Sequence, residues 1–470
     1  MTRSALASLF VLAICATAFL LTQNGCGATP NTIQHVVIVF QENRTPDNLF
    51  QDPVLISRGA DIVNHGVDTA GHTIPLSPID LGTNGSNPDY YDLGHAHNAF
   101  VQMCDRDSSR GVCAMDGANL IWTGCSDGVR FCLPEHPQFK YVKADDVQPY
   151  FQLAEQYTFA DRMFQTNQGP SFPAHQFIIS GTSAPAVGSK LFVAENPGGL
   201  NNANSDTGCT SPPTEYVDVI DSKGNEAPIY PCFEHPTLTD LLNTKGVSWR
   251  YYAPGAGSIW TAPNAIQHMC GPNATPPDAT ACVGSDWTNH VVLATRQNPA
   301  PVLTDIANGR LPSVSWVIPN GQDSDHPSGN DGSGPSWVAS IVNAIGHSPY
   351  WPNTVILITW DDWGGWYDHV PPPKMLNSYE YGFRVPMIVV SRYTKRAYIS
   401  HSTHDFGSIL KFVEEIFGLP SLGYADVPAD DLSDCFDFNQ TPVPFQTIAA
   451  PLPAEHFLND RRPPTDPDDD

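Results

Sequence analysis

Positive charge is scarce in this 470-residue chain: 23 lysines and arginines stand against 49 aspartates and glutamates, for a net charge of −26 at pH 7. Binding through nucleic-acid phosphates needs clustered basic residues, so the composition argues against a nucleic-acid-binding protein. Attraction to an anionic membrane surface is disfavoured for the same reason. A polyanionic substrate fits such a chain only if a bound cation reverses the local field.

Several sequence signatures are also missing. No C-x-x-C spacing is present, so the cysteines do not indicate a zinc site of that type. No G-x-S-x-G segment is present, so an ordinary α/β-hydrolase triad lacks its main signature. There is no internal repeat, and no linker separates two domains. The hydrophobic content of 41% is enough for the core of one large domain.

The amino terminus has the features of an export signal. Arg3 supplies a positive charge, residues 5–21 form an uncharged apolar run, and small residues follow at 25–28. We therefore expect a signal peptide at residues 1–28 and a periplasmic or secreted protein with no stable membrane span after cleavage. An uncleaved anchor, or a lipid anchor at Cys26, is the alternative.

Cysteine spacing agrees with export to an oxidising compartment. The chain has 11 cysteines, and most of those outside the leader fall into near neighbours along the chain, which predicts disulfides that staple loops. One residue, Cys435, is left over and is either free or paired with Cys26. The expected pairs are Cys104 with Cys113, Cys125 with Cys132, Cys209 with Cys232, and Cys270 with Cys282.

Apolar runs and helix-start signals alternate along the chain, which predicts an α/β fold with a largely parallel sheet. We expect a catalytic domain at 30–440, with long insertions near 104–145 and 195–235, and a proline-rich acidic tail at 441–470 that wraps the surface. The expected strands are 35–40, 247–252, 314–318, 354–359 and 385–390, and the expected helices are 149–156, 238–243, 337–345 and 408–417.

Residues 354–373, TVILITWDDWGGWYDHVPPP, combine a buried strand with adjacent acids. The β-branched run predicts a strand that ends at Asp361 and Asp362, and ligands gather at the carboxyl ends of strands in open α/β sheets. Two neighbouring carboxylates kept from water repel each other, so one is protonated or a cation lies between them. The surrounding aromatic residues argue against a solvated acidic turn and favour a metal site.

A second strand end supplies compatible ligands. The run HVVIVF continues almost directly into Glu42 and Asn43. A carboxylate and an amide oxygen are hard ligands suited to a divalent cation. Such a pair alone is more typical of a turn or a helix cap. Together with Asp361 and Asp362, it predicts a four-oxygen site for a divalent metal ion.

Ser171 is the predicted nucleophile. It lies in QTNQGPSFPAHQF, residues 165–177, between Pro170 and Phe172-Pro173, a context that predicts a rigid turn. A fixed hydroxyl beside a cation can lose its proton and attack a substrate. The alternative is a turn serine or helix cap, which is the commoner role of serine in isolation.

Histidines in flanking loops offer partners for an anionic substrate or a leaving group. Any one of them taken alone is more often a structural hydrogen-bonding residue than a catalyst. Two lie in YDLGHAHNAF, one in DSDHPSG and one in YDHVPPP, and His401 and His404 in SHSTHDF rank behind them. The four candidates are His95, His97, His326 and His369.

Five segments, in this order, resemble the bacterial phosphoesterase family of phosphate-specific phospholipases C and acid phosphatases: QHVVIVFQENRTPDNLF, YTFADRMFQTNQGPSFPAHQFIISGTS, SDHPSG, TWDDWGGWYDHVPPP and FRVPMIVVSRYTKRAYISHSTHDFGSILKFVEEIFGLPSL. They cover most of residues 33–422. The resemblance implies an alkaline-phosphatase-like three-layer sandwich, with a largely parallel mixed sheet between helical layers. It further implies Ser171 as a metal-bound nucleophile and a metal held by Glu42, Asn43, Asp361 and Asp362.

The nucleophile turn departs from the family pattern. Members commonly carry threonine or serine, a variable residue and then Pro-Asn-Arg, whereas Ser171-Phe172-Pro173 is followed here by Ala174 and His175. The asparagine and arginine are therefore missing. We expect His175 to replace part of the lost cationic contact with the substrate.

These observations predict an exported, metal-dependent enzyme that hydrolyses a phosphate ester through a phosphoseryl intermediate. His326 or His369 would donate a proton to the leaving alcohol, and His95, with His97 and His175, would bind the substrate. The acidic composition favours soluble phosphomonoesters, as in an acid phosphatase. A phospholipase C acting on phosphodiester headgroups is one alternative. An exported binding protein that keeps the fold without the chemistry is the other, and the altered turn supports it.

Overall fold

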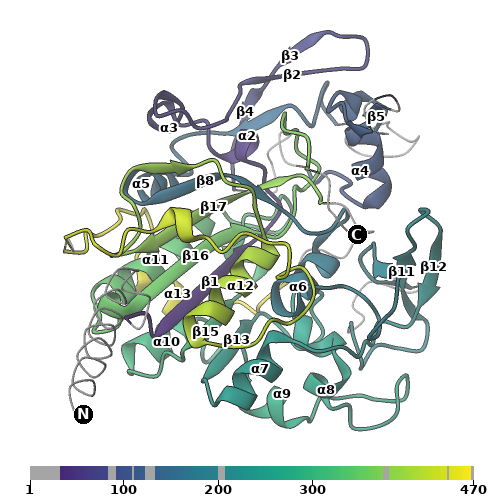
Figure 1. Cartoon of the computed structure of the whole chain (residues 1–470), viewed down its shortest axis with the longest axis vertical. Helices are drawn as coiled ribbons and strands as arrows, with labels where there is room; N and C mark the ends of the chain where they lie inside the picture. The colour runs from purple at the N-terminus through teal and green to yellow at the C-terminus, as the bar shows by residue number, and fades with distance from the viewer. Residues whose placement is uncertain are drawn as a thin grey trace, which may run out of the picture.

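The computed structural model describes residues 32–82, 91–107, 109, 111–121, 133–199, 207–373, 381–441 and 444–466. At its centre is a nine-stranded sheet, which Figure 1 shows crossing the molecule between helices. Its strands are β1 (His35–Gln41), β8 (Thr158–Phe164), β13 (Trp249–Ala253), β14 (Val291–Leu293), β15 (Val314–Val317), β16 (Thr354–Trp360), β17 (Arg384–Ser391), β18 (Tyr398–Ser400) and β19 (His404–Asp405). The five strands predicted from the sequence are all present, with ends shifted by at most two residues.

The sheet is mixed but largely parallel, as predicted. Its order is β14-β13-β15-β1-β16-β17-β8-β18, with β19 also paired to β8. Of the described strands in this sheet, only β17 runs against its neighbours, pairing antiparallel with both β16 and β8. Strands β1, β15, β16 and β8 therefore point the same way, and their carboxyl ends meet at one edge of the sheet.

Helical layers cover both faces of the sheet. Phe40 packs against Phe406 and His175 on one face. Trp360 is paired with Gln41, the residue after Phe40, so its side chain lies on the opposite face, where it packs against Tyr150. This double cover explains why β16 and β17 are buried at every position and read as continuous apolar runs.

The first face carries α6 (Ser171–Ser180), α7 (Leu238–Lys245) and α12 (Phe406–Phe417), with α6 touching the other two. The second carries α5 (Gln148–Gln156), α10 (Pro301–Ala307), α11 (Gly334–Gly346) and α13 (Ala454–Leu458), with α11 touching the other three. Helix α12 begins two residues before the predicted start. Asp405 is its N-cap and Ser408 its third residue, and their side chains form a reciprocal capping box.

Short elements fill the insertions. The remaining helices are α2 (Pro46–Leu49), α3 (Pro53–Ser57), α4 (His97–Cys104), α8 (Gln267–Cys270) and α9 (Ser285–His290). The remaining strands are β2 (His65–Val67), β3 (Thr73–Pro75), β4 (Ser77–Ile79), β5 (Arg106–Asp107), β6 (Val112–Cys113), β7 (Lys140–Val142), β9 (Phe192–Val193), β10 (Gly198–Gly199), β11 (Glu215–Ile220) and β12 (Glu226–Ile229).

Three of the four predicted disulfides are formed: Cys104–Cys113, Cys209–Cys232 and Cys270–Cys282. The predicted pair Cys125–Cys132 and the predicted signal peptide with Cys26 lie outside the described residues. Cys435 is a free, buried thiol. Within the described ranges, no helix combines the length and apolar character needed to cross a bilayer.

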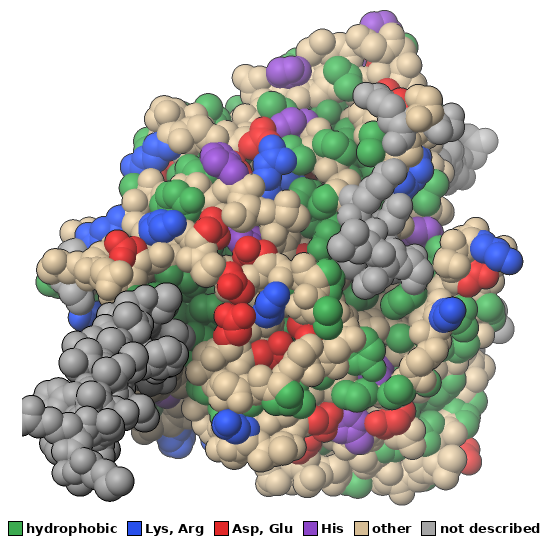
Figure 2. Space-filling view, in the orientation of Figure 1, with side chains coloured by type: hydrophobic (Ala, Val, Ile, Leu, Met, Phe, Trp, Pro, Cys, Tyr) green, Lys and Arg blue, Asp and Glu red, His purple; other side chains and the backbone are tan. Residues whose placement is uncertain are grey.

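The acidic composition is visible on the surface. Figure 2 shows carboxylate side chains gathered near the middle of one face, with lysine and arginine side chains scattered around them. The described part of the carboxy-terminal segment places α13 against α10 and α11 of the second helical layer. Its helix α13 inserts Phe457 against Trp337 of α11, with ring centroids 5.2 Å apart.

The tail should contribute to stability through this contact. Phe457 is almost fully buried, so Phe457→Ala should lower the free energy of unfolding by about 3 kcal/mol. The neighbouring His456 is exposed, and His456→Ala should change it by less than about 0.5 kcal/mol. Chemical denaturation of both variants checks this, and equal stability for the two would contradict the packing argument.

Candidate active site

The predicted metal ligands meet where β1 and β16 end. The two strands are parallel neighbours in register, with Gln41 opposite Trp360, so Glu42 and Asp361 also become neighbours. The backbone N–H of Asp361 donates to the carbonyl of Gln41 at 2.9 Å, and the N–H of Asn43 donates to Asp361 Oδ1 at 2.8 Å. Strand pairing therefore places side chains that are more than 300 residues apart along the chain.

The first glycine after the acids, Gly364, is required by close packing against Asn43. Asn43 has a left-handed backbone with φ of 55°, a conformation that asparagine tolerates better than most residues. Gly364 also has a positive φ, of 60°, and a Cβ built there would lie 2.5 Å from the carbonyl oxygen of Asn43. The sequence WDDWGGW thus shapes the backbone that presents two of the predicted ligands.

Ser171 is the first residue of α6, which corrects the prediction of a rigid turn. Pro170 is the N-cap residue, and the following ten residues are buried on every side because α6 lies between the sheet, α7 and α12. The Ser171 hydroxyl donates to Asp362 Oδ2 at 3.1 Å and lies 3.5 Å from Asn43 Oδ1. The structure therefore brings the predicted nucleophile to the predicted ligands.

His95 orients the side chain of Asn43. Its Nδ1–H donates to the carbonyl of Leu93 at 2.7 Å, which leaves Nε2 to accept from the Asn43 side-chain amide at 3.1 Å. In this arrangement the amide oxygen of Asn43 faces Ser171. His95 Nε2 also lies 3.8 Å from Asp362 Oδ2. A histidine that holds a neighbouring ligand in this way acts on the geometry of the site.

His175 lies one helical turn after Ser171 and reaches the same site. Its Nε2 is 3.3 Å from Glu42 Oε1, and both side chains have no exposed surface. One ligand-type atom from each of Glu42, His175 and Asp361 lies within 4.8 Å of the others. The sequence predicts contact with substrate for His175, whereas the structure sets its ring beside two predicted metal ligands.

These side chains fit a divalent cation. Glu42, Asp361 and Asp362 are fully buried, and burying three carboxylates is costly unless positive charge accompanies them. Asp361 Oδ2 has no hydrogen-bond partner among the residues that the structure describes. Carboxylate and amide oxygens with one imidazole nitrogen are a suitable donor set for such an ion.

His326 reaches this region from the loop after β15. Its ring lies 6.3 Å from that of His95 and 5.9 Å from that of Trp260, measured between centroids. Its Nδ1 is within hydrogen-bonding distance of both the N–H and the carbonyl of Ser328, each at 3.1 Å, so Ser328 can support either tautomer. The imidazole is thus held in place next to the residues described above.

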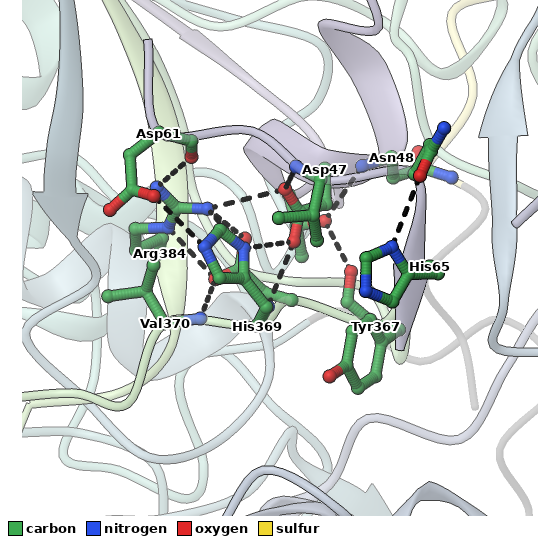
Figure 3. A network of polar contacts seen from close by, with 12 residues as sticks. Asp47, Asn48, Asp61, His65, Tyr367, His369, Val370 and Arg384 are labelled. Atoms are coloured by element: carbon green, nitrogen blue, oxygen red, sulfur yellow. Dashed lines mark hydrogen bonds and ion pairs between the residues drawn. The ribbon is translucent and has the colours of Figure 1, made fainter. Parts of the chain in front are cut away.

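The other two predicted histidines have different surroundings. His97 begins α4, stacks on Phe100, and places its Nδ1 2.9 Å from the carbonyl of Gln168. His369 uses both ring nitrogens in a separate network, which Figure 3 shows: Nδ1 lies 2.7 Å from Asp47 Oδ2 and Nε2 lies 3.0 Å from Asp61 Oδ1. A ring engaged on both sides by carboxylates is not placed as a proton donor to a leaving group.

The network around His369 anchors the end of the loop that begins with Asp361. Arg384 of β17 makes two hydrogen bonds to the carboxylate of Asp368, at 2.8 and 2.9 Å, and lies 3.5 Å from Asp47. Burial opposes protonation of His369, but the hydrogen bond and charge of Asp47 outweigh it and raise the pKa to about 9. The imidazole is therefore positively charged at neutral pH.

Three residues near the site carry no predictive signal in the sequence. Asn196 Oδ1 accepts from the backbone N–H of Phe172 at 2.9 Å, beside the nucleophile. Glu195 accepts from the N–H of His97, and burial raises its pKa to about 7. Trp260 stacks on His175 with centroids 6.4 Å apart. All three lie in irregular segments between regular elements, where no strand or helix pattern indicates their direction.

The chain is similar to several known proteins. A family model described as the Phosphoesterase family matches residues 33–420. Phospholipase C B of Mycobacterium tuberculosis is 23% identical over 89% of this chain and 81% of its own. The Hemolytic phospholipase C of Pseudomonas aeruginosa is 24% identical over 87% of this chain and 56% of its own length. The Non-hemolytic phospholipase C of Burkholderia pseudomallei is 25% identical over 83% and 56%.

Solved structures resemble the chain more distantly. A protein in the alkaline phosphatase superfamily from Vibrio parahaemolyticus aligns with a TM-score of 0.34 and 12% sequence identity, over 62% of this chain and 65% of that one.

The close contact between Gly364 and the backbone of Asn43 gives a test of the site. Gly364→Ala should push Asn43 out of place and reduce both bound divalent metal and phosphoesterase activity, by about tenfold or more in rate. Gly188 is the matched control, because it has φ of 76° and no atom within 4 Å of an added Cβ. Gly188→Ala should keep both properties, and equal behaviour of the two variants would contradict the proposed role of the contact.

The charge on His369 predicts a loss of stability in alkali. Its folded-state pKa of about 9 lies above the ordinary value of 6.5, so its contribution is complete below about pH 6.5 and is lost as pH rises through about 9. The contribution is at most about 3 kcal/mol. Thermal melting between about pH 6 and 10 should show this decline, and His369→Gln should flatten it.

His401 provides the control for that measurement. Its side chain is 55% exposed and its ring lies within 3 Å of an Asp161 carboxylate oxygen. His401→Gln should keep the alkaline decline of the parent protein. An unchanged decline in His369→Gln would show that other groups cause it.

Proposed function

The chain belongs to the phosphoesterase family, and is thus a hydrolase acting on phosphoester bonds; on that premise we propose that it is an exported, metal-dependent phosphodiesterase of the phospholipase C type. The observation that carries the chemistry is the buried hydroxyl of Ser171, 3.1 Å from Asp362 and 3.5 Å from Asn43. Export is supported by the disulfides and by the signal-like amino terminus.

The relatives support a phosphodiester substrate. The three described above are phospholipases C that match more than four-fifths of this chain, so the proposed substrate is a phospholipid, whose headgroup ester is cleaved. The prediction of acid phosphatase activity on monoesters rested on an acidic composition. Net charge bears on association and solubility more than on which ester the site cleaves.

Ser171 is the proposed nucleophile. Its oxygen attacks phosphorus, the bond from phosphorus to the diacylglycerol oxygen breaks, and the phosphorylated headgroup is carried on Ser171 until water releases it. Asp362 accepts the hydrogen of the serine hydroxyl and fixes the direction of attack. The position of Ser171 at the start of α6 also directs the positive end of the helix toward the phosphoryl group.

Glu42, Asn43, Asp361 and Asp362 are the proposed ligands of a divalent cation, and His175 is placed to join them. Such an ion supplies charge neutralisation at the phosphoryl oxygens and lowers the pKa of a nearby hydroxyl. His95 keeps the amide oxygen of Asn43 turned toward the site. The proposed proton donor to the leaving oxygen is His326 and not His369.

Substitution of the nucleophile tests the proposed chemistry. Ser171→Ala should lower the rate on phosphatidylcholine vesicles by at least about 10²-fold while the melting temperature stays within a few degrees. Ser57 is an exposed serine whose hydroxyl donates to the Val54 carbonyl in its own turn, and Ser57→Ala should keep full activity. Near-parental turnover by purified Ser171→Ala protein would refute its role.

A second assay separates the candidate functions. Phosphatidylcholine and a chromogenic phosphomonoester should be compared at equal enzyme concentration, before and after chelation and divalent-metal add-back. The proposal expects faster diester cleavage that chelation abolishes and metal restores, and Asp361→Asn should bind less metal by elemental analysis. Faster monoester cleavage would instead favour an acid phosphatase. No turnover and no bound metal would favour a binding protein of the same fold.

A further inference from the structure

A second group of ligand-type side chains lies at the β18–β19 edge of the sheet. His404 is the first residue of β19, and Cys435 ends the short 3-10 helix η5 (Ser433–Cys435), which also carries Asp434. Both His404 and Cys435 are buried. These residues lie on different segments from those of the proposed phosphoesterase site and share no ligand with it.

The three side chains converge on a small volume. One ligand-type atom from each of His404, Asp434 and Cys435 lies within 4.8 Å of the others. His404 Nε2 is 3.5 Å from Asp434 Oδ1, and Cys435 Sγ is also 3.5 Å from that oxygen. For comparison, zinc bonds of about 2.0–2.3 Å at tetrahedral angles place their ligand atoms about 3.3–3.7 Å apart. Two edges of the triangle therefore already have the spacing of a tetrahedral zinc site.

A further carboxylate lies beside the histidine. Asp430 Oδ1 is at ion-pair distance from His404 Nδ1, 2.8 Å away, while Nε2 lies on the side of Asp434. A carboxylate on the far ring nitrogen is the usual outer partner of a metal-bound histidine. Ser400 Oγ donates to the other oxygen of Asp434 at 2.5 Å, which holds Oδ1 on the side of the thiol.

We propose that His404, Asp434 and Cys435 form a zinc-binding site. Nε2, Oδ1 and Sγ are the three protein ligands, and a water molecule takes the fourth position, since Asp434 is 25% exposed and leaves an entry path from solvent. Binding releases the thiol proton of Cys435 to solvent and exchanges the 3.0 Å contact between Nε2 and Ser400 for a bond to zinc.

The donor set selects this metal. A thiolate and an imidazole are poor ligands for calcium or magnesium, which take oxygen, and they suit zinc in a tetrahedral arrangement. The charges agree, because Zn²⁺ balances the thiolate and the Asp434 carboxylate. The proposed active site, by contrast, contains no sulfur ligand, which makes the two sites distinguishable by spectroscopy.

A zinc ion at this site would stabilise α12, the helix that packs against α6. Zinc bonds to His404 and Cys435 would close a loop that contains all of α12. The first residue of α6 is Ser171. The Cys435 carbonyl accepts from the Lys395 N–H at 2.8 Å and from the Thr158 hydroxyl at 3.2 Å, so η5 is already attached to β8. Zinc would add a second attachment of the same segment.

Cobalt substitution tests the proposal. The purified full-length protein is stripped of metal with a chelator and loaded with Co²⁺, and its absorption spectrum is recorded. A cobalt–thiolate bond gives a near-ultraviolet charge-transfer band, and tetrahedral coordination gives intense visible bands. The proposal expects both in the parent protein, with the charge-transfer band lost in Cys435→Ser. It also expects one more zinc per chain in the parent than in Cys435→Ser by elemental analysis after zinc loading.

Two controls assign the signal. Asp361→Asn alters the proposed active site and should keep the charge-transfer band. His401 is the exposed neighbour of His404, and His401→Asn should keep the band, whereas His404→Asn should lose it. Cys435→Ser should melt about 5 °C below the parent in zinc and at the same temperature as the parent after chelation.

The same measurements can also refute the zinc site. If the cobalt-loaded parent shows no thiolate band and binds as much zinc as Cys435→Ser, the cluster is a hydrogen-bonded network in which the thiol donates to Asp434, and the proposal is wrong. Failure of Ser171→Ala or Asp361→Asn to change phosphoesterase activity would refute the proposed function and leave this result untouched.

Discussion

Burying three carboxylates at two adjacent strand ends is the constraint on which the rest of the candidate site depends. Glu42, Asp361 and Asp362 have no exposed surface, although a buried carboxylate is among the costliest groups to remove from water. A buried carboxylate is tolerated only where surrounding groups hydrogen-bond to it or balance its charge. The backbone N–H of Asn43 and the ring of His175 do so for Asp361 and Glu42, and a bound cation would supply the remaining charge.

The surrounding structure serves to hold these acids in one geometry. Parallel pairing sets the register of β1 and β16, and the missing side chain of Gly364 lets the loop after Asp362 close onto Asn43. At the other end of that loop, Arg384, Asp47 and His369 form an ion-pair network. Substitutions in this network are therefore expected to act on the candidate site indirectly, through the position of the loop.

Helix α6 links the candidate site to α12. It presents Ser171 and His175 to the site at a spacing of four residues, which sets them on the same side of the helix. Its other side packs against α12, whose N-cap Asp405 follows directly after His404. The proposed zinc site and the proposed nucleophile are thus attached to neighbouring helices, so the first can affect stability near the second without sharing a residue.

The sequence by itself determined the strands and the chemistry at their ends, because continuous apolar runs and the acids that follow them are local patterns. From these it was possible to predict the layered fold and to select Glu42, Asn43, Asp361 and Asp362. Ser171 was selected from its proline-flanked context, and the structure brings it to these four residues. The tertiary structure alone decided the placement of the histidines. His369 follows the acids closely along the chain, yet both of its ring nitrogens contact carboxylates of a separate network. His175 reaches Glu42 because it lies on a helix, where the sequence predicted a turn. A histidine side chain can donate, accept or bind a metal in many surroundings, so its partners depend on segments distant in the sequence, and no local pattern specifies them.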